Sequence, residues 1–188
     1  MRTVIYSMSV SLDGFIAGSD GDIGWTAPDQ ELFAFHVQQT PGIGTELMGR
    51  RLYEAMLVWE TAETTMSGTD ELEFARIWKA IPKVVFSATL HEVQGNAQLA
   101  SDDVAGEVAK LRATPGEGVI SVGGAGLAST LIKLDLIDEY RLFVNPVVLG
   151  GGTPYFPALD RRIELELLET RTFGSRVVYL RNRRVRRG

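Results

Sequence analysis

The sequence contains no cysteine and only two histidines among its 188 residues. The absence of cysteine excludes disulfide bonds, thiolate metal sites and a cysteine nucleophile. The two histidines, His36 and His91, lie far apart in the chain, which argues against a histidine-based metal site, so no metal is expected. Any chemistry must therefore come from other residue types.

Long apolar runs are also missing, since no stretch approaches the roughly 20 apolar residues that span a bilayer. The N-terminal segment TVIYSMSVS has strand character and lacks the charged-then-apolar pattern of a leader. We therefore expect a cytoplasmic protein without a membrane partner. Apolar residues make up 45% and charged residues 23% of the chain, as in packed globular proteins, and the length favours one domain over 1–188.

Positive charge is scarce except at the C-terminal end. The formal net charge is -5, yet five arginines lie in the last eight residues, RNRRVRRG. Subtracting these five from the 19 basic residues leaves 14, against 24 acidic residues. A basic tail over 181–188 is one way to bind nucleic acid. Because nothing else in the chain is basic, we expect a solvated strand end and frayed terminus, with no nucleic-acid partner.

Apolar runs of strand length alternate with longer segments of helical spacing, which indicates an α/β fold with a mainly parallel sheet and helices on both faces. The expected strands are 2–10, 44–49, 82–88, 118–122 and 139–148, followed by a terminal pair at 163–171 and 175–183. The expected helices are 28–39, 51–58, 70–80, 102–113 and 125–135. Segment 59–70 is expected to be a surface loop.

Turn and cap residues support these boundaries. Pro28 suits a first helical turn, and Ser101 or Asp102 suits an N-cap. The tripeptide Phe173-Gly174-Ser175 predicts a tight turn, with glycine available for a positive φ, that closes the terminal pair into an antiparallel hairpin.

Four glycine-marked junctions lie where predicted strands end, which is where open α/β sheets bind ligands. In SVGGAG (121–126), the glycines would let the backbone approach a pyrophosphate at a helix N-terminus, although a tight turn without a ligand is the alternative. In MGRRLY (48–53), two arginines oppose the helix dipole, so either a bound anion or surface salt bridges would explain them. Arginine suits the ribose phosphate that distinguishes NADPH from NADH. The other junctions are SVSLDGFIAG (9–18) and VVLGGGTP (147–154).

Taken together, these segments resemble the dihydrofolate reductase superfamily and, within it, the reductase domain of the bifunctional riboflavin deaminase-reductase and its stand-alone relatives. The resemblance runs in order from Thr3 to about Tyr179. GDIGWTAPDQELFAF and ELMGRRLYEAM are similar to dihydrofolate reductases, whereas SLDGFIAG and NPVVLGGGTPYF are more like the riboflavin-pathway reductases. The resemblance implies a three-layer dihydrofolate reductase-like fold, a cis peptide at the double glycine, and a homodimer.

The resemblance also implies NADPH as cofactor and assigns site residues. Those for the cofactor phosphates are Gly49, Arg50 and Arg51, and Ser87 would meet the adenosine end. Those for the pyrophosphate are Gly123, Gly124, Ala125 and Gly126, while Ile16 and Ala17 would flank the nicotinamide. Those on the substrate side are Ser9, Asp13, Trp25, Leu32 and Phe35, with Asp13 also a catalytic candidate.

The main catalytic candidate is an acid in the first helix, because dihydrofolate reductases use a carboxylate there to help supply the proton that accompanies hydride transfer. Alignment from Trp25 points near Asp29 or Gln30, whereas alignment from Leu32 and Phe35 points to Glu31. Helical geometry favours Glu31, which lies four residues before Phe35, while Asp29 suits a solvated first turn. If Glu31 is the acid, we expect partial burial to raise its pKa. For His36, Trp59 and Trp78 we expect structural roles.

The expected function is hydride transfer from NADPH to a small nitrogen heterocycle or to a sugar chain attached to one. By resemblance, the leading candidate is 5-amino-6-(5-phosphoribosylamino)uracil reductase-type activity of riboflavin biosynthesis. Reduction of a pterin, as in dihydrofolate reductase, is the first alternative, and a non-catalytic NADPH- or ligand-binding protein is the second. These 188 residues include neither a deaminase domain nor a clear basic cluster for a sugar phosphate, which weighs against the riboflavin assignment.

Overall fold

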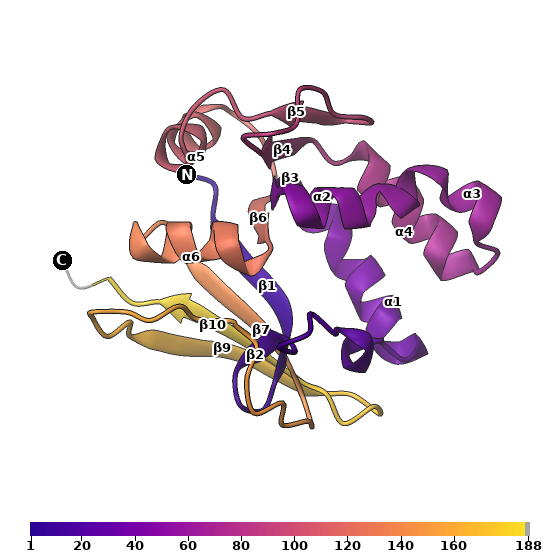
Figure 1. The fold of residues 1–188 in the computed structure, drawn as a ribbon, viewed down its shortest axis with the longest axis vertical. Coiled ribbons are helices and arrows are strands. Elements are labelled where there is room, and N and C mark those ends of the chain that lie inside the picture. Colours follow the sequence, from indigo (N-terminus) through magenta and orange to yellow (C-terminus); the bar gives the residue numbers. More distant parts are fainter. Residues whose placement is uncertain (187–188) are drawn as a thin grey trace.

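Eight strands form one mixed sheet in the computed structural model, which describes residues 1–186 (Figure 1). Strands β5, β4, β3, β6, β1 and β7 pair in parallel in that order, β10 is antiparallel to β7, and β9 is antiparallel to β10. Their bounds in this order are Ala97–Leu99, Lys83–Phe86, Ile43–Gly49, Val119–Gly123, Val4–Ser11, Glu139–Asn145, Val178–Arg184 and Leu165–Thr172. The predicted mainly parallel sheet with a terminal antiparallel hairpin is confirmed.

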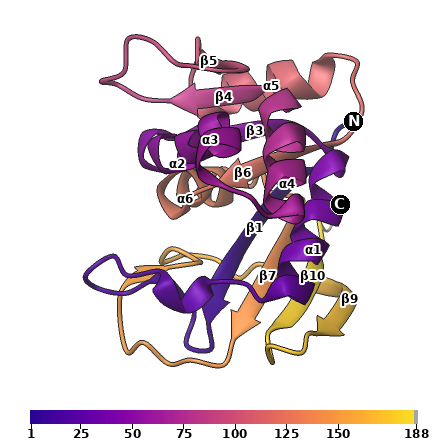
Figure 2. The same cartoon turned by 90° about the vertical axis from the view of Figure 1, so that its right-hand side faces the viewer.

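Helices cover both faces of this sheet, as Figures 1 and 2 show. One face carries α1 (Gln30–Gln39), α2 (Arg50–Met56), α3 (Ala62–Thr65) and α4 (Thr69–Ala80). The other carries α5 (Val104–Ala113) and α6 (Ala125–Lys133). Three 3-10 turns, η1 (Gly24–Thr26), η2 (Thr40–Gly42) and η3 (Leu57–Thr61), connect these elements. Within residues 1–186, no helix is both long enough and apolar enough to cross a membrane.

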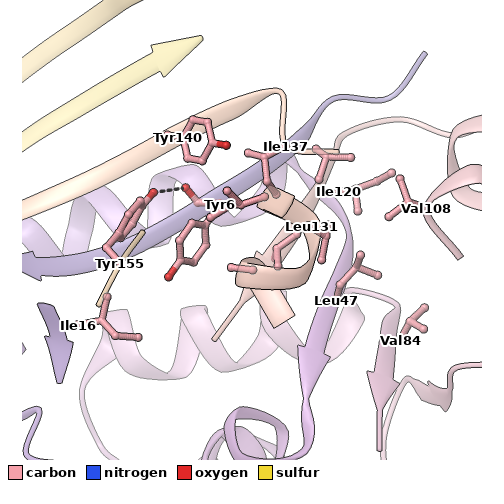
Figure 3. Close-up of a cluster of buried hydrophobic side chains, with 14 of the residues drawn as sticks. Tyr6, Ile16, Leu47, Val84, Val108, Ile120, Leu131, Ile137, Tyr140 and Tyr155 are labelled. Atoms are coloured by element: carbon pink, nitrogen blue, oxygen red, sulfur yellow. Dashed lines mark hydrogen bonds between the residues drawn. The ribbon is translucent and has the colours of Figure 1, made fainter. Parts of the chain in front are cut away.

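The central strand β1 is buried on both faces, as parallel strands between two helical layers are. Val4, Tyr6 and Val10 belong to the cluster beneath α5 and α6, of which Figure 3 shows Tyr6, whereas Ile5 faces the side of α1 and α4. Tyr155 stacks on Tyr6 with ring centroids 4.3 Å apart and donates its hydroxyl to the Tyr6 carbonyl oxygen at 3.0 Å. This contact attaches the segment after β7 to the centre of the sheet.

The smallest elements were not predicted. A two-stranded sheet joins β2 (Phe15–Ala17) to β8 (Thr153–Pro154), and the edge strand β5 is only three residues long. Segment 59–70, expected to be a loop, contains the end of η3 and all of α3. These short pieces are stabilised by their partners in the fold rather than by a periodic pattern of their own, so the sequence carries little signal for them.

Several predicted caps are wrong by one or two residues. Helix α1 begins at Gln30, and Asp29 is its N-cap, accepting the Leu32 N–H at 2.8 Å, so Pro28 precedes the helix. The N-cap of α5 is Asp103, not Ser101 or Asp102. A side chain three residues before a free N–H reaches it best from extended backbone, and Asp29 and Asp103 both have that conformation.

Two turn predictions are also corrected. The β9–β10 hairpin places Arg176, not Gly174, at positive φ (67°), because its three-residue loop needs a left-handed residue at the last position. The peptide between Gly123 and Gly124 is trans, like every peptide bond in residues 1–186, so the implied cis bond is wrong. The chain turns there because Gly124 has a φ of 88°.

The arginines near the C-terminus belong largely to β10. Their ion-pair partners in the same chain are Glu139 for Arg181, Glu166 for Arg183, Asp135 for Arg184 and Asp138 for Arg186. The expected strand end is confirmed as far as Arg184, whereas Arg187 and Gly188 lie outside the described residues. The basic character of this segment is therefore balanced locally by carboxylates.

Candidate active site

The predicted cofactor residues lie together at the carboxyl ends of neighbouring parallel strands. The register pairs Gly49 of β3 with Phe86 of β4, and Met48 of β3 with Gly123 of β6. Ser87 directly follows Phe86, so the ends of β4, β3 and β6 form one edge. This edge is where ligands bind in open α/β sheets.

The glycine turn between β6 and α6 is shaped by a neighbouring helix. A Cβ at Gly123 would lie 2.2 Å from Cδ2 of Leu52, so a larger residue fits only if the Leu52 side chain shifts. A Cβ at Gly49 or Gly126 would meet no heavy atom within 4 Å, so the surface beside them is open. No side chain caps the N-terminus of α6. Its first N–H groups are therefore available to an anion approaching the open glycines.

Arg50 and Arg51 follow Gly49 directly and are exposed. Neither side chain forms a hydrogen bond or an ion pair with any other described residue, so the alternative of surface salt bridges is not realised. Two unpaired guanidinium groups beside an open glycine surface suit a phosphate group, because the planar fork of arginine matches its oxygens.

Ser87 makes a local turn at the end of β4. Its hydroxyl accepts the N–H groups of Thr89 at 3.1 Å and Leu90 at 2.9 Å. Lone pairs engaged in this way fix the loop but leave the hydroxyl hydrogen free to donate. The structure thus places Ser87 at the edge of the predicted cofactor surface.

Asp13 joins two of the four glycine junctions. Its carboxylate accepts the Ser11 hydroxyl at 2.7 Å and the N–H groups of Leu149 at 3.1 Å and Gly150 at 2.7 Å. These hydrogen bonds, with that from Ser11 the largest contribution, lower the pKa of Asp13. A carboxylate that accepts three hydrogen bonds holds the loop in place and stays ionised. This environment does not suit the catalytic role that we predicted for Asp13.

Ile16 and Ala17, the residues predicted to flank the nicotinamide, lie on the small sheet of β2 and β8 next to Asp13. Ile16 packs into the main cluster near Tyr155 (Figure 3), and Ala17 pairs with Thr153 of β8. A Cβ at Gly152 would lie 2.0 Å from the carbonyl oxygen of Ala17, so this junction requires glycine. Segments 9–18 and 147–154 therefore form one unit at the end of β1.

A cavity of about 340 Å³ lies between the sheet and the helices of the α1 face. Its walls are mainly aromatic and include Phe33 of α1, Trp59 of η3, and Phe74 and Trp78 of α4. Its floor is formed by side chains of the sheet strands, among them those of Ile5, Ser7, Glu46, Ser121 and Arg141. An aromatic cavity with a few convergent polar groups is typical of a site for a small flat molecule.

The polar side chains of the cavity differ in charge. Burial raises the pKa of Glu46 to about 7, although the Lys83 ammonium and the Trp78 side chain oppose this rise. Burial lowers the pKa of His36 to about 4, so this imidazole is neutral near pH 7, and its ring packs 4.5 Å from that of Phe143. Arg141 is held by Glu139, with Nε 2.6 Å from the carboxylate oxygen.

The predicted substrate face of α1 points elsewhere. Leu32 and Phe35 are buried in a separate cluster with Phe143, Phe173, Val177 and Tyr179, while Phe33, His36 and Gln39 of α1 line the cavity. Both faces of α1 carry aromatic residues, so periodicity alone did not distinguish the core face from the cavity face.

Glu31 shares a face with Phe35, as predicted, but that face meets the β9–β10 hairpin. Its carboxylate accepts the Gly174 N–H at 2.9 Å and pairs with Arg171 at 3.0 Å. The Gly174 hydrogen bond, followed by the Arg171 contact, lowers the pKa of Glu31, so the expected rise is wrong. Glu31 is not among the cavity-lining residues.

The other substrate candidates, Trp25 and Ser9, are not among the residues that line the cavity. Trp25 belongs to η1, and its Nε1–H donates to the carbonyl oxygen of Asp22 at 3.2 Å. Ser9 lies two residues beyond Ser7 on β1, on the same side of the strand. Trp59, Trp78 and His36, expected to be structural, line the cavity.

The residue that sequence reasoning missed is Glu46. A signal was present, because TELMG places one acidic residue in the interior of a predicted parallel strand. Such strands are normally apolar on both faces, so a carboxylate within one needs a specific reason.

Comparison with known proteins identifies the family. Residues 2–179 match the model of the RibD C-terminal domain, and the chain belongs to this family. It is 37% identical to the uncharacterized protein YyaP of Bacillus subtilis over 183 residues, covering 95% of this chain and 93% of YyaP. It is 31% identical to the uncharacterized protein YwjB of the same organism, covering 94% of each.

Solved structures agree on the fold. A candidate riboflavin biosynthesis protein from Shewanella sp. PV-4 superimposes with a TM-score of 0.77 at 23% identity, covering 99% of this chain and all of that one. A diaminohydroxyphosphoribosylaminopyrimidine deaminase/5-amino-6-(5-phosphoribosylamino)uracil reductase from Thermotoga maritima gives 0.66 at 17% identity, covering 98% of this chain and 57% of that one. Dihydrofolate reductase from Enterococcus faecalis, complexed with NADP(H), gives 0.63 at 16% identity, covering 97% and 96%. The dihydrofolate reductase-like fold is thereby confirmed.

Proposed function

We propose that the protein is an NADPH-dependent oxidoreductase that reduces a small nitrogen heterocycle. The main support is that two features lie next to each other. The open glycine surface beside the unpaired side chains of Arg50 and Arg51 adjoins the aromatic cavity. Strand β6 connects them, because Ser121 lines the cavity and Gly123 begins the glycine turn two residues later. A phosphate-binding surface adjoining a small aromatic site is what a dinucleotide-dependent reduction requires.

The residues present fit the cofactor. Arg50 and Arg51 would hold its phosphates, the turn at Gly123 and Gly124 would admit its pyrophosphate, and Ile16 would pack near its nicotinamide. The open space at Gly49 and Gly126 supports this assignment, because added side chains would fill the surface that the phosphates approach. Once bound, the dinucleotide supplies a hydride to the acceptor.

The chain itself supplies position and exclusion of water. Phe33, Trp59 and Phe74 would enclose a planar ring by stacking and edge contacts. Ser7, Ser121 and Arg141 offer hydrogen-bond partners on the sheet side. These polar groups on the sheet side of an aromatic cavity help to fix the orientation of a heterocycle whose edge carries nitrogen and oxygen atoms.

The leading substrate is an aminouracil bearing a sugar chain, the type of molecule in the name of the Thermotoga maritima relative by structure. A dihydropterin is the second candidate, favoured by the fold shared with the Enterococcus faecalis dihydrofolate reductase. Consumption of NADPH separates either reductase from a non-catalytic binding protein. We expect the absorbance of reduced nicotinamide to decay when 5-amino-6-(5-phosphoribosylamino)uracil or dihydrofolate is supplied, and no decay with a broad panel of heterocycles would contradict the enzymatic assignment.

The arginine pair provides a sharper test of the cofactor site. At 100 times its Kd, NADPH is expected to increase the free energy of unfolding by about 2.7 kcal/mol. The midpoint temperature of thermal unfolding should therefore rise. Combining Arg50→Ala with Arg51→Ala should weaken NADPH binding at least 10-fold, because a charge-assisted hydrogen bond contributes about 1.5–3 kcal/mol. Arg76→Ala, which removes an exposed arginine paired with Glu73 on α4, is the matched control and should bind normally. Equal protection of all three proteins would contradict the site.

A further inference from the structure

Glu46 is the acidic residue that lines the aromatic cavity, and no other carboxylate of residues 1–186 does so. The sheet register places it beside Ser121 of β6, which is itself beside Ile5 of β1. A Cβ at Gly123 would lie 3.9 Å from its Oε1, so the carboxyl group is close to the glycine turn where the cofactor is expected. Glu46 therefore lies between the cavity and the cofactor edge.

Within residues 1–186, the carboxyl group of Glu46 has no salt-bridge partner. The nearest ammonium, that of Lys83 on β4, donates instead to the carbonyl oxygens of Trp78 at 2.7 Å and Ile81 at 2.9 Å and lies over the Trp78 ring. Lys83 is buried, so its charge is satisfied by these contacts. A carboxyl group inside protein without a dedicated cation favours its protonated form.

A second polar group adjoins this carboxyl group. Trp78 is 1% exposed and lines the cavity, and its Nε1–H lies close enough to the Glu46 carboxylate to lower the pKa of that group, yet it forms no well-aligned hydrogen bond within residues 1–186. A buried N–H without a well-aligned acceptor costs free energy that a ligand can recover. An N–H donor beside an acid matches the edge of a heterocycle that presents both acceptor and donor atoms.

We propose that Glu46 is the acid of this cavity, which donates a proton to a nitrogen or oxygen atom of the bound heterocycle as that molecule is reduced. This inference rests on the proposed function. Reduction of a C=N or C=O bond adds a hydride, with two electrons, to carbon and a proton to the heteroatom. The dinucleotide supplies the hydride. The Glu46 O–H bond breaks, an N–H or O–H bond forms on the acceptor, and the carboxylate regains a proton from water.

The protonation state of Glu46 suits this role. Burial is the largest influence and raises its pKa to about 7, so near neutral pH both the acid and its conjugate base are populated. Besides Glu46, the charged or titratable side chains that line the cavity are His36 of α1, Arg141 of β7 and Tyr179 of β10. Lys83 of β4 is not a lining residue, and its charge interacts with both Glu46 and Glu60 of η3. His36 is neutral near pH 7, and Arg141 is paired with Glu139, so neither replaces Glu46 as a proton donor.

The first experiment needs no turnover. Carbon-13 NMR of protein labelled at the glutamate carboxyl carbon should show one resonance that titrates near pH 7 and is absent from Glu46→Gln. Adding 5,6-diaminouracil should shift that resonance in the wild-type protein. A Glu46 resonance that titrates near the ordinary glutamate value of 4.5, or that ignores the ligand, would overturn the proposal.

The second experiment uses turnover. Glu46→Gln keeps the shape but removes the acidic proton, so the rate of NADPH oxidation should fall about 100-fold, while the Kd for NADPH stays unchanged. The matched control is Glu73→Gln, an exposed glutamate of α4 paired with Arg76, which should retain full activity. Unchanged turnover by Glu46→Gln would refute the role of Glu46 alone. Failure of the wild-type protein to bind NADPH would refute the proposed function, whatever the NMR titration shows.

Discussion

Asp13 and Glu46 are both carboxylic acids near the proposed site, yet their surroundings drive them in opposite directions. Asp13 is at the surface and accepts three hydrogen bonds, which lower its pKa. Glu46 is enclosed by the cavity and has no salt bridge, which raises its pKa. Hydrogen bonds to the charged form lower the pKa of a carboxyl group, whereas burial without a counter-charge raises it. Residue type alone therefore does not identify the acid.

We expect the contribution of Asp13 to stability to depend on pH. Because the folded-state pKa of Asp13 is lowered, its contribution to stability is present above the unfolded value of 3.8 and is lost as pH falls through the folded value. Asp13→Asn should therefore lower the unfolding temperature at pH 7, and the difference from wild type should shrink below about pH 4. Thermal unfolding across pH measures this, with the exposed Asp160→Asn as control. If the difference in unfolding temperature between wild type and Asp13→Asn grows on acidification, Asp13 does not stabilise the loop through its ionised carboxylate.

Glu31 gives a second prediction. Its ion pair with Arg171 and hydrogen bond from Gly174 attach α1 to the terminal hairpin and lie outside the cavity lining. We expect Glu31→Gln to reduce thermal stability slightly and to leave the pH profile of NADPH oxidation unchanged. Loss of turnover in Glu31→Gln, with normal folding, would return the catalytic role to the first-helix acid.

Sequence patterns predicted those features of strands, helices and turns that depend only on residues close together in the chain. The glycine turn at 123–126 and the arginine pair at 50–51 were found because glycine and charge at a strand end are visible in a few neighbouring residues. The environment of Glu46 was not, because it depends on Trp78 and Lys83 arriving from α4 and β4. The wrong face of α1 was chosen for a related reason: Phe33 and Phe35 are equally apolar, and only tertiary packing separates them.

The turn before α6 yields a prediction from backbone geometry. Gly124 has a φ of 88°, a conformation that costs a residue with a Cβ about 1–3 kcal/mol, so Gly124→Ala should destabilise the fold by that amount. Gly126 lies inside α6 with open space around it, so Gly126→Ala should be neutral or stabilise by up to about 1 kcal/mol. Urea unfolding of the pair measures the contrast, and equal stabilities would contradict the described turn.

For the whole molecule, the chain folds its most basic segment into the sheet. Arg181, Arg183, Arg184 and Arg186 are paired with carboxylates, so few charges remain for phosphate contacts of a nucleic acid. We expect no binding to duplex DNA or RNA in fluorescence anisotropy at physiological salt. Binding that weakens steeply with added salt would contradict this expectation. The homodimer implied by the resemblance stays a prediction, tested by light scattering against the chain mass of 20.6 kDa.

We propose that the carboxyl edge of β4, β3 and β6 binds a dinucleotide that carries an extra ribose phosphate. Calorimetric titration of the purified protein with NADPH, and in parallel with NADH, measures this binding. We expect saturable binding of NADPH that is clearly tighter than binding of NADH. Absence of any binding heat from NADPH at millimolar concentration, or equal affinity for the two nucleotides, would contradict it.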